Sequence, residues 1–175
     1  MDRVFETARL IVRKFKIEDA QCLYAHHLEE DVKRWFPNEC YADMEETVSA
    51  IGFYVDRVEH KKLPYVLAVE LKETGELIGD TGISEVDGRA NEVEIGYIIG
   101  KEFRAKGYAT EVLSAMTAFA FSSFGVNTVY ARVICGNDAS VRVLEKSGYC
   151  FVEKELGAAD DPYDRGMLVY KKDRF

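Results

Sequence analysis

The stretch KEFRAKGYATEVL, residues 101–113, places two cations and a glycine just before an amphipathic run. A helix that begins near Gly107 would present N–H groups without intrahelical partners at the positive end of its dipole. Such a helix end attracts anions. Gly107 would let the backbone approach a phosphate closely, Ala109 would keep the first turn free of bulk, and Arg104 and Lys106 would add charge for a diphosphate. The stretch therefore predicts an anion site, and the alternative is an ordinary helix start with two solvated cations.

Other ligand signatures are absent from the sequence. Neither the phosphate loop GxxxxGK[ST] nor the dinucleotide fingerprint GxGxxG with a downstream acid occurs. The four cysteines, Cys22, Cys40, Cys135 and Cys150, form no CxxC pair and have no nearby histidine cluster. We therefore expect reduced thiols and no metal.

Composition and charge restrict the class of protein. The 175 residues suit one domain spanning 1–175, and 47% hydrophobic with 31% charged content is typical of a globular protein. A net charge of -8 argues against a nucleic-acid partner and favours a cationic or neutral substrate. The N-terminus MDRVFETARL lacks the apolar core of a signal peptide, and no apolar segment is long enough to span a bilayer. We expect a cytoplasmic protein without membrane contact, either a monomer or a homodimer.

The elements that would position the anion site can be read from hydrophobic periodicity. Residues 8–15 alternate as a strand, residues 17–31 have helical spacing, and a second helix is predicted from Met44 to about His60. Residues 63–100 are β-rich and contain the turns KETGE and DGRAN, which predicts an antiparallel meander of three strands.

The C-terminal part alternates between helices and strands. A long helix follows Lys106, residues 127–135 form a strand, residues 137–148 a helix, and residues 149–156 and 165–172 two further strands. The predicted order is βααβββαβαββ. It describes an α/β (α+β) fold with a mixed sheet of about seven strands and helices packed on it.

Three motifs in this order resemble the GNAT superfamily of N-acetyltransferases. RAKGYA matches the R/Q-x-x-G-x-G/A motif between the fourth strand and the next helix, and NDASVRVLEKSGYCFVE resembles the second half of the acyl-CoA site. TARLIVRKFKIEDA is similar to the opening of the branch with the ribosomal-protein N-terminal acetyltransferases, called RimJ/RimL-like. The resemblance covers nearly the whole chain.

The resemblance implies a mostly antiparallel sheet whose fourth and fifth strands splay, with acetyl-CoA as cosubstrate lying in the gap. Gly96 and Gly100 agree with it, because glycine within a strand marks a bulge or a close backbone approach. The main chain at Ile98 and Ile99 would bond the acetyl and pantetheine groups, and Ser140 would contact the arm beside Asn137. The residues implied to hold acetyl-CoA are Ile98, Ile99, Arg104, Ala105, Lys106, Gly107, Tyr108, Ala109, Thr110 and Asn137.

Transfer to an amine requires a neutral amine, stabilisation of an oxyanion and a proton for the departing thiolate. Val93, Ile95, Tyr97 and Ile99 share one strand face, which leaves Glu92 and Glu94 with Gly96 on the other. By resemblance to relatives with an acidic residue near this point, Glu94 is the expected base. The alternative is a solvent-exposed acidic face.

The residue that would protonate the departing thiolate departs from a common family pattern. Many members carry a tyrosine four residues before the glycine of K-x-G-F/Y, and here that residue is Leu144, which cannot donate a proton. Tyr149 is interpreted as a core residue. Ser140 is the candidate donor or water holder, and the alternative is an unassisted thiolate that solvent protonates.

The acceptor site is expected between the N-terminal helices and their loop. Trp35, Phe36 and Tyr41 form an aromatic loop there, and the alternative for Trp35 is an anchor of the helix end in the core. The acidic segments EED and AADDPYDR would steer a cationic amine, or would simply be solvated. His26, His27 and His60 show no partner spacing and are interpreted as surface residues.

Three functions remain open from the sequence. The first is an acetyltransferase for a protein N-terminal α-amine, and the second acts on a small molecule such as a polyamine, aminoglycoside or amino acid. The third is a non-catalytic acyl-CoA-binding module, which the missing tyrosine favours. Glu94 and the intact loop favour the first two.

Overall fold

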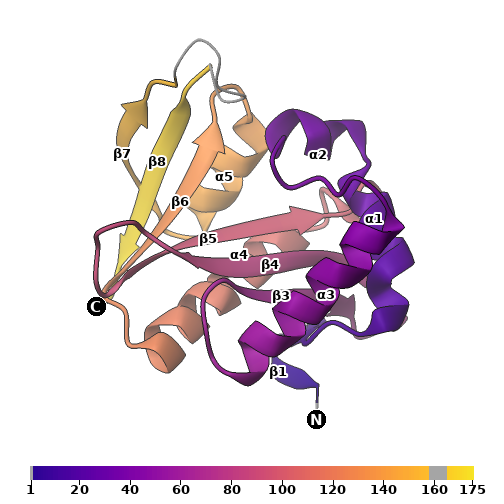
Figure 1. The fold of residues 1–175 in the computed structure, drawn as a ribbon. Helices are drawn as coiled ribbons and strands as arrows, with labels where there is room; N and C mark the ends of the chain where they lie inside the picture. Colours follow the sequence, from indigo (N-terminus) through magenta and orange to yellow (C-terminus); the bar gives the residue numbers. More distant parts are fainter. Residues whose placement is uncertain (1, 158–164) are drawn as a thin grey trace.

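A computed structural model describes residues 2–157 and 165–175, and Figure 1 shows one central sheet with helices on both faces. The sheet has eight strands in the order β1-β2-β3-β4-β5-β6-β8-β7. All neighbours are antiparallel except β5 and β6, which run parallel. The mixed, mostly antiparallel sheet predicted from the sequence is therefore confirmed.

The strands are β1 Arg3–Glu6, β2 Leu10–Arg13, β3 Tyr65–Leu71, β4 Leu77–Glu85, β5 Glu92–Ile99, β6 Thr128–Ile134, β7 Cys150–Glu155 and β8 Met167–Asp173. The α-helices are α1 Ala20–His27, α2 Glu30–Trp35, α3 Met44–Glu59, α4 Tyr108–Phe119 and α5 Asp138–Lys146. Short helical turns occupy Ile17–Asp19, Lys101–Phe103 and Ala120–Phe124.

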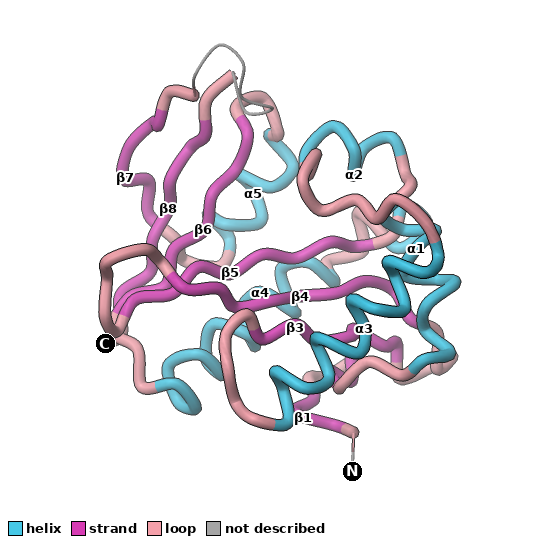
Figure 2. Tube along the Cα trace, viewed as in Figure 1, coloured by secondary structure: helices cyan, strands magenta, loops and turns pink. Residues whose placement is uncertain are grey.

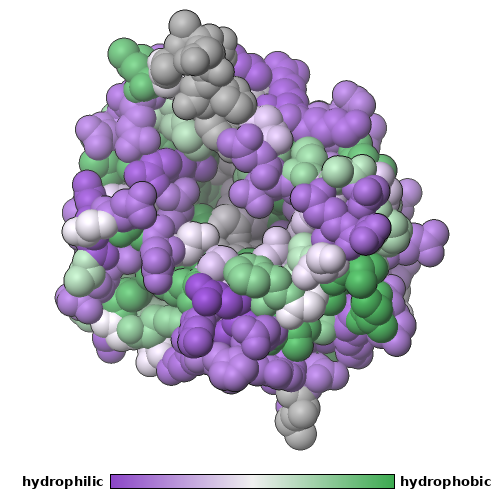
Figure 3. Space-filling model, viewed as in Figure 1, coloured by the Kyte–Doolittle hydropathy of each residue, from purple (hydrophilic) through white to green (hydrophobic). Residues whose placement is uncertain are grey.

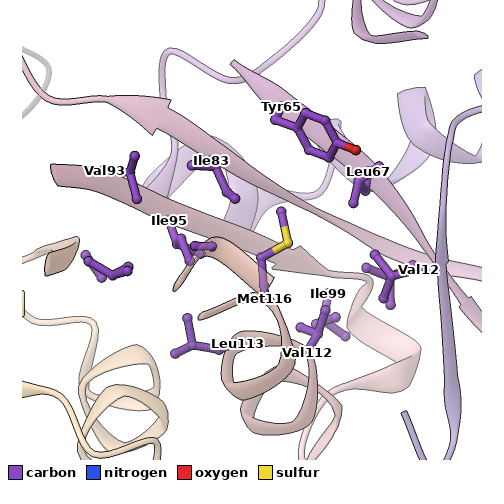
Figure 4. Packing of buried hydrophobic residues seen from close by; sticks show 14 of the residues in the cluster. Val12, Tyr65, Leu67, Ile83, Val93, Ile95, Ile99, Val112, Leu113 and Met116 are labelled. Carbon is purple, nitrogen blue, oxygen red and sulfur yellow. The ribbon is translucent and has the colours of Figure 1, made fainter. Parts of the chain in front are cut away.

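The larger core lies between the sheet and α4. The α4 side chains of Val112, Leu113 and Met116 are fully buried and face the apolar side chains of the strands, as Figure 4 shows. Their spacing in the sequence predicts one apolar stripe, because residues three and four apart share a helix face. Burial of the stripe fixes the position of α4, and with it the loop that precedes α4.

Helices α1 and α3 cover the opposite face of the sheet, as the two ribbon views show. A second apolar cluster fills this layer, and it consists of Phe15, Ala20, Leu23, Ile51, Ala68 and Leu77. Beside it the Arg13 guanidinium is buried and paired with Asp19 at 2.8 Å and with Glu70 at 2.6 Å. This pairing compensates a charge that would otherwise be costly to bury.

Two N-terminal elements differ from the sequence prediction. Strand β1 is additional, and its four residues extend the sheet beyond the expected seven strands. The predicted helix 17–31 ends at His27, and the short helix α2 follows after a break at Glu29, whose backbone has φ -59 and ψ 138. Neither short element has enough residues to show a clear period.

Figure 3 shows the α3 side of the molecule, where hydrophilic side chains cover most of the surface. The surface is hollowed near the centre, between helix α2 and the C-terminal strands. Across the described residues, no helix has the length and apolar character needed to cross a membrane.

Candidate active site

The sheet opens between β5 and β6. The two strands pair only from Glu92 with Thr128 to Glu94 with Tyr130. Beyond that point β5 stays paired with β4 as far as Ile99, and β6 stays paired with β8 as far as Ile134. Figure 1 shows the resulting divergence of β5 from β6. The splay that the family resemblance implied for the fourth and fifth strands occurs at these two strands.

Alternation along β5 decides which backbone groups face the gap. The Gly100 N–H donates to Ile78 O on β4 at 2.8 Å, and a Cβ on Gly79 would lie 2.1 Å from Ile98 O. In an antiparallel pair, alternate residues point their polar backbone groups to the neighbour and away from it. The backbone of Ile98 therefore faces β4, which corrects the expectation for its main chain, whereas Tyr97 faces the gap.

A cavity of about 570 Å³ lies at the open end of this gap. It brings together α2, the end of β5, the residues before and within the first turn of α4, and one side of α5. The lining residues are Asp31, Val32, Trp35, Phe36, Tyr97, Ile98, Ile99, Phe103, Arg104, Ala105, Gly107, Tyr108, Ala109, Thr110, Asn137, Ala139, Ser140, Arg142, Val143 and Lys146. Most of the predicted site residues thus line one cavity, whereas Lys106, Tyr41 and Glu94 lie outside it.

The loop before α4 has the backbone shape that its glycine suggested. Gly107 caps α4 in the left-handed region with φ 83 and ψ 3. Ala105 also has a positive φ of 60, a conformation that costs an L-residue energy. The first N–H groups of α4, from Tyr108 to Thr110, have no carbonyl four residues back within the helix. They lie at the positive end of the helix dipole and beside the cavity.

The side chain of Arg104 is bound on the protein side of this loop. It donates to Glu29 at 2.5 Å, to Asp31 at 2.8 Å and to Ile99 O at 2.8 Å. Glu29 also accepts from the Lys101 N–H at 3.0 Å. The guanidinium that was expected to attract a diphosphate therefore fastens the loop to α2, and the EED segment expected to steer an amine supplies its partners.

Two other cations line the cavity. Arg142 and Lys146 are one turn apart on α5 and line the same cavity as the first turn of α4. Sequence reasoning missed both, because exposed cations on an amphipathic helix are ordinary. Their spacing of four residues, which places both side chains on one face of α5, was the available signal.

Glu94 lies at the point where β5 and β6 separate, on the face turned toward α1 and α3. The Arg132 side chain on β6 donates to it and also donates to Glu155 at 3.1 Å. Burial raises the pKa of Glu94, and the Arg132 charge only partly opposes this shift. A carboxylate with a raised pKa at this point is suited to accept a proton. Glu92 lies farther back, where its carboxylate pairs with Arg89 at 3.3 Å.

Two hydroxyl groups meet on the cavity side of the sheet. Tyr97 on β5 donates to the Ser140 hydroxyl on α5 at 3.3 Å. Leu144, which stands at the usual tyrosine position, is 1% exposed within the core. Tyr149 is buried, as predicted, and its hydroxyl lies 2.7 Å from that of Thr117. Sequence reasoning placed Tyr97 on the correct strand face and overlooked its hydroxyl.

The predicted acceptor residues separate into two groups. Trp35 and Phe36 line the cavity from the end of α2, and the Trp35 ring lies near Gly136 at the start of the α5 turn. Tyr41 lies under α3, where its hydroxyl is 3.2 Å from that of Tyr54. The aromatic residues therefore do not form one surface. Most of the segment AADDPYDR, residues 158–164, lies outside the described residues.

Two histidines contradict the surface interpretation. His26 is 8% and His27 2% exposed, while His60 is exposed as predicted. The His27 Nε2 lies 2.9 Å from Asp80, and its Nδ1 lies 2.5 Å from Glu39 O. Burial opposes a charge on this ring, but the Asp80 carboxylate and the Glu39 contacts together outweigh burial and raise the pKa of His27. Non-local packing, which joins α1 to β4, made the surface interpretation wrong.

Comparisons with known proteins place this architecture among acetyltransferases. The family model described as "Acetyltransferase (GNAT) domain" matches residues 9–149. The uncharacterized N-acetyltransferase YoaA of Bacillus subtilis is 32% identical over 174 residues, which cover 98% of each chain. The chain belongs to the GNAT acetyltransferase family, and it is an acyltransferase.

Two solved structures share the fold at low sequence identity. A ribosomal-protein-S5-alanine acetyltransferase from Vibrio fischeri has a TM-score of 0.82 and 19% identity, with 97% of this chain and 95% of that chain covered. Spermidine N-acetyltransferase from Vibrio cholerae, in complex with CoA and spermine, has a TM-score of 0.79 and 17% identity, with 95% and 96% covered. The neighbours thus include enzymes named for protein and for small-molecule acceptors.

Proposed function

We propose that this chain transfers the acetyl group of acetyl-CoA to a primary amine, and that the preferred amine is the α-amine of a protein N-terminus. The observation that carries the proposal is the opening between β5 and β6, which leads into the cavity beside the N-terminal end of α4. A backbone edge, an anion-binding helix end and a cavity meet there. An elongated, phosphate-containing acyl donor needs these three features.

The residues around the cavity fit this donor. Its volume of about 570 Å³ is in the range of small-molecule sites. The amides of Tyr108, Ala109 and Thr110 would hold the pyrophosphate, and Arg142 and Lys146 would add positive charge from α5. The exposed backbone of β5 would bond the amide groups of the pantetheine arm. Acetyl-CoA supplies the activated acyl group; the protein supplies binding and orientation.

Glu94 is proposed to take the proton from the amine, directly or through one water. It faces the α1 and α3 side of the sheet, whereas the cavity with Ser140 opens on the α4 side. An amine that enters on the Glu94 side would meet the acyl group through the gap between β5 and β6. Ser140 is proposed to donate a hydrogen bond on the leaving-group side.

Charge pairing supports an acceptor with a single amine. On the face that carries Glu94, that carboxylate is paired with Arg132, Asp80 is paired with His27, and burial raises the pKa of the nearby Glu39, which disfavours its charged form. A polyamine carries several positive charges and would be bound best by several unpaired carboxylates. An N-terminal α-amine needs only one base. The structural neighbour named for a ribosomal-protein acceptor is consistent with this choice.

The test measures thiol release from acetyl-CoA with three kinds of acceptor: short peptides with free N-termini, spermidine and an aminoglycoside. We expect turnover with a free-N-terminal peptide and none with the same peptide acetylated at its N-terminus but containing lysine. Faster turnover with spermidine would overturn the choice of acceptor. Absence of acetyl-CoA binding, measured as no rise in melting temperature where NAD and ATP serve as controls, would overturn the donor.

A further inference from the structure

Tyr97 and Ser140 form a pair of hydroxyl groups at the cavity wall. Their side chains come from different elements, β5 and α5, and both line the cavity. The Tyr97 O–H donates to the Ser140 oxygen at 3.3 Å. The other hydroxyls of the lining, on Tyr108 and Thr110, belong to the first turn of α4, where the pyrophosphate is proposed to bind. The pair therefore lies in a different part of the cavity wall from the proposed phosphate site.

The Ser140 hydroxyl can donate a hydrogen bond to a ligand while it accepts one from Tyr97. A serine hydroxyl has one proton and two lone pairs. Because Ser140 accepts from Tyr97, its own proton stays available, and no acceptor for that proton lies within hydrogen-bond distance among the described residues. Burial raises the pKa of Tyr97 to about 12, although its bond to Ser140 opposes the shift. Tyr97 therefore remains a donor throughout the neutral range.

We propose that Tyr97 is a positioning residue that orients the Ser140 hydroxyl, so that Ser140 donates a hydrogen bond to the thioester sulfur as the bond between carbon and sulfur breaks. The inference rests on the proposed function. It assigns to two residues on β5 and α5 the role left open by Leu144, whose side chain is buried and apolar. A donated bond from Tyr97 also strengthens the bond that Ser140 donates, since linked hydrogen bonds polarise one another.

The step balances without a proton leaving either hydroxyl. The amine nitrogen bonds to the carbonyl carbon, the bond between carbon and sulfur breaks, and its electron pair goes to sulfur. The amine proton goes to Glu94 or to water, and the released thiolate later takes a proton from water. Ser140 and Tyr97 lower the energy of the negative sulfur and keep their own protons.

Ligand binding gives a readout that does not depend on turnover. The thiol of free CoA ionises like an ordinary thiol, with a pKa near about 8.5, and acetyl-CoA has no ionisable sulfur. A hydrogen bond that favours bound thiolate should raise the affinity for CoA relative to acetyl-CoA by about 10-fold as pH rises from about 7 to about 9.5. Titration calorimetry at several pH values measures the ratio of the affinities for CoA and acetyl-CoA. Protein groups whose titration changes both affinities equally do not change this ratio.

Three variants test the roles of the two hydroxyls. Ser140→Ala should abolish the pH dependence of the affinity ratio, and Tyr97→Phe should reduce it to about 2-fold or less. Tyr149→Phe is the matched control, because it removes a buried tyrosine hydroxyl that bonds to Thr117 and lies outside the cavity lining. Tyr149→Phe should keep the wild-type ratio at every pH.

Kinetics then test whether Tyr97 acts through Ser140. We expect kcat to fall about 10-fold in Tyr97→Phe and about 10- to 100-fold in Ser140→Ala, while the dissociation constant of acetyl-CoA changes less than about 3-fold. The double variant should be no slower than Ser140→Ala alone. The inference would be overturned if the losses of kcat in the two single variants added in the double variant, or if the affinity ratio of CoA to acetyl-CoA in the wild type did not depend on pH. Continued binding of acetyl-CoA in either case would leave the proposed function intact. Failure of both ligands to bind would overturn the proposed function itself.

Discussion

Replacing Gly107 with alanine should test how the loop before α4 serves the proposed donor site. Gly107 has a φ of 83, and a Cβ there would lie 3.3 Å from the end of the Arg9 side chain. That contact is with a flexible group, so space does not forbid the methyl group. The left-handed conformation does penalise it, by about 1–2 kcal/mol relative to glycine.

This strain must appear in one of two measurements. If the loop keeps its conformation in Gly107→Ala, the unfolding free energy falls by about 1–2 kcal/mol, or about 2–8 °C in melting temperature for a chain of this size. If the loop instead relaxes before ligand binds, acetyl-CoA must restore the binding conformation. Its affinity then falls by up to about 5- to 30-fold. If the loop relaxes only in part, the same strain of about 1–2 kcal/mol is divided between the loss of stability and the loss of acetyl-CoA affinity.

Gly75→Ala provides the matched control. Gly75 also has a positive φ, of 74, with open space around a Cβ, and it lies in the turn between β3 and β4, outside the cavity lining. It should lose similar stability with unchanged affinity. Calorimetric titration with acetyl-CoA and denaturant unfolding measure both quantities for both variants. The reasoning would be refuted if Gly107→Ala changed neither quantity, or if Gly75→Ala weakened acetyl-CoA binding equally.

Three further expectations follow from single side chains. Glu94→Gln should lower turnover by about 10²-fold near pH 7, with partial recovery at higher pH and unchanged acetyl-CoA affinity. Glu92→Gln, the control, should lower turnover much less. Equal pH–rate profiles for the two variants would contradict the role of Glu94. Ala105→Gly should raise the unfolding free energy by up to about 1 kcal/mol in denaturant titrations, because glycine removes the strain of φ 60. The raised pKa of His27 should add stability that is complete below its ordinary pKa near 6.5 and is lost as pH rises through the folded-state pKa. Asp80→Asn should flatten this dependence in unfolding measured from about pH 5 to 9, and an unchanged slope would remove His27 as its source.

Local patterns predicted the elements that rest on repeated spacing. The predicted helix from Met44 to about His60 is α3, whose cap Asp43 accepts from the Glu46 N–H at 2.8 Å. The face of β5 that carries Val93 packs in the larger core, as its alternation indicated. In both cases the signal lies within one segment, and burial of one face is enough to select the structure.

Contacts between distant segments could not be read in the same way. Arg104 and Glu29 are 75 positions apart in the sequence, and their side chains form an ion pair in the structure. Because the sequence does not show this pair, the charge of Arg104 was assigned to a ligand, whereas the Glu29 carboxylate compensates it. His27 was interpreted as exposed because its partner, Asp80, comes from another element. The hydroxyl of Tyr97 was overlooked for the same reason, since only the packing of α5 beside β5 reveals Ser140 as its neighbour.

The early separation of β5 from β6 gives one strand two different rates of isotope exchange. From Gly96 to Ile99, alternate amides of β5 bond to β4, and those between them face the gap, beyond the last pair that β5 forms with β6. Amides bonded within the sheet exchange with deuterated solvent only when the structure opens, whereas those facing the gap need no opening. In the absence of ligand, Gly96 and Ile98 should therefore retain hydrogen far longer than Tyr97 and Ile99. Neighbouring residues of one buried strand would then differ in protection, and a molecule that completes the strand from the gap side would remove the difference.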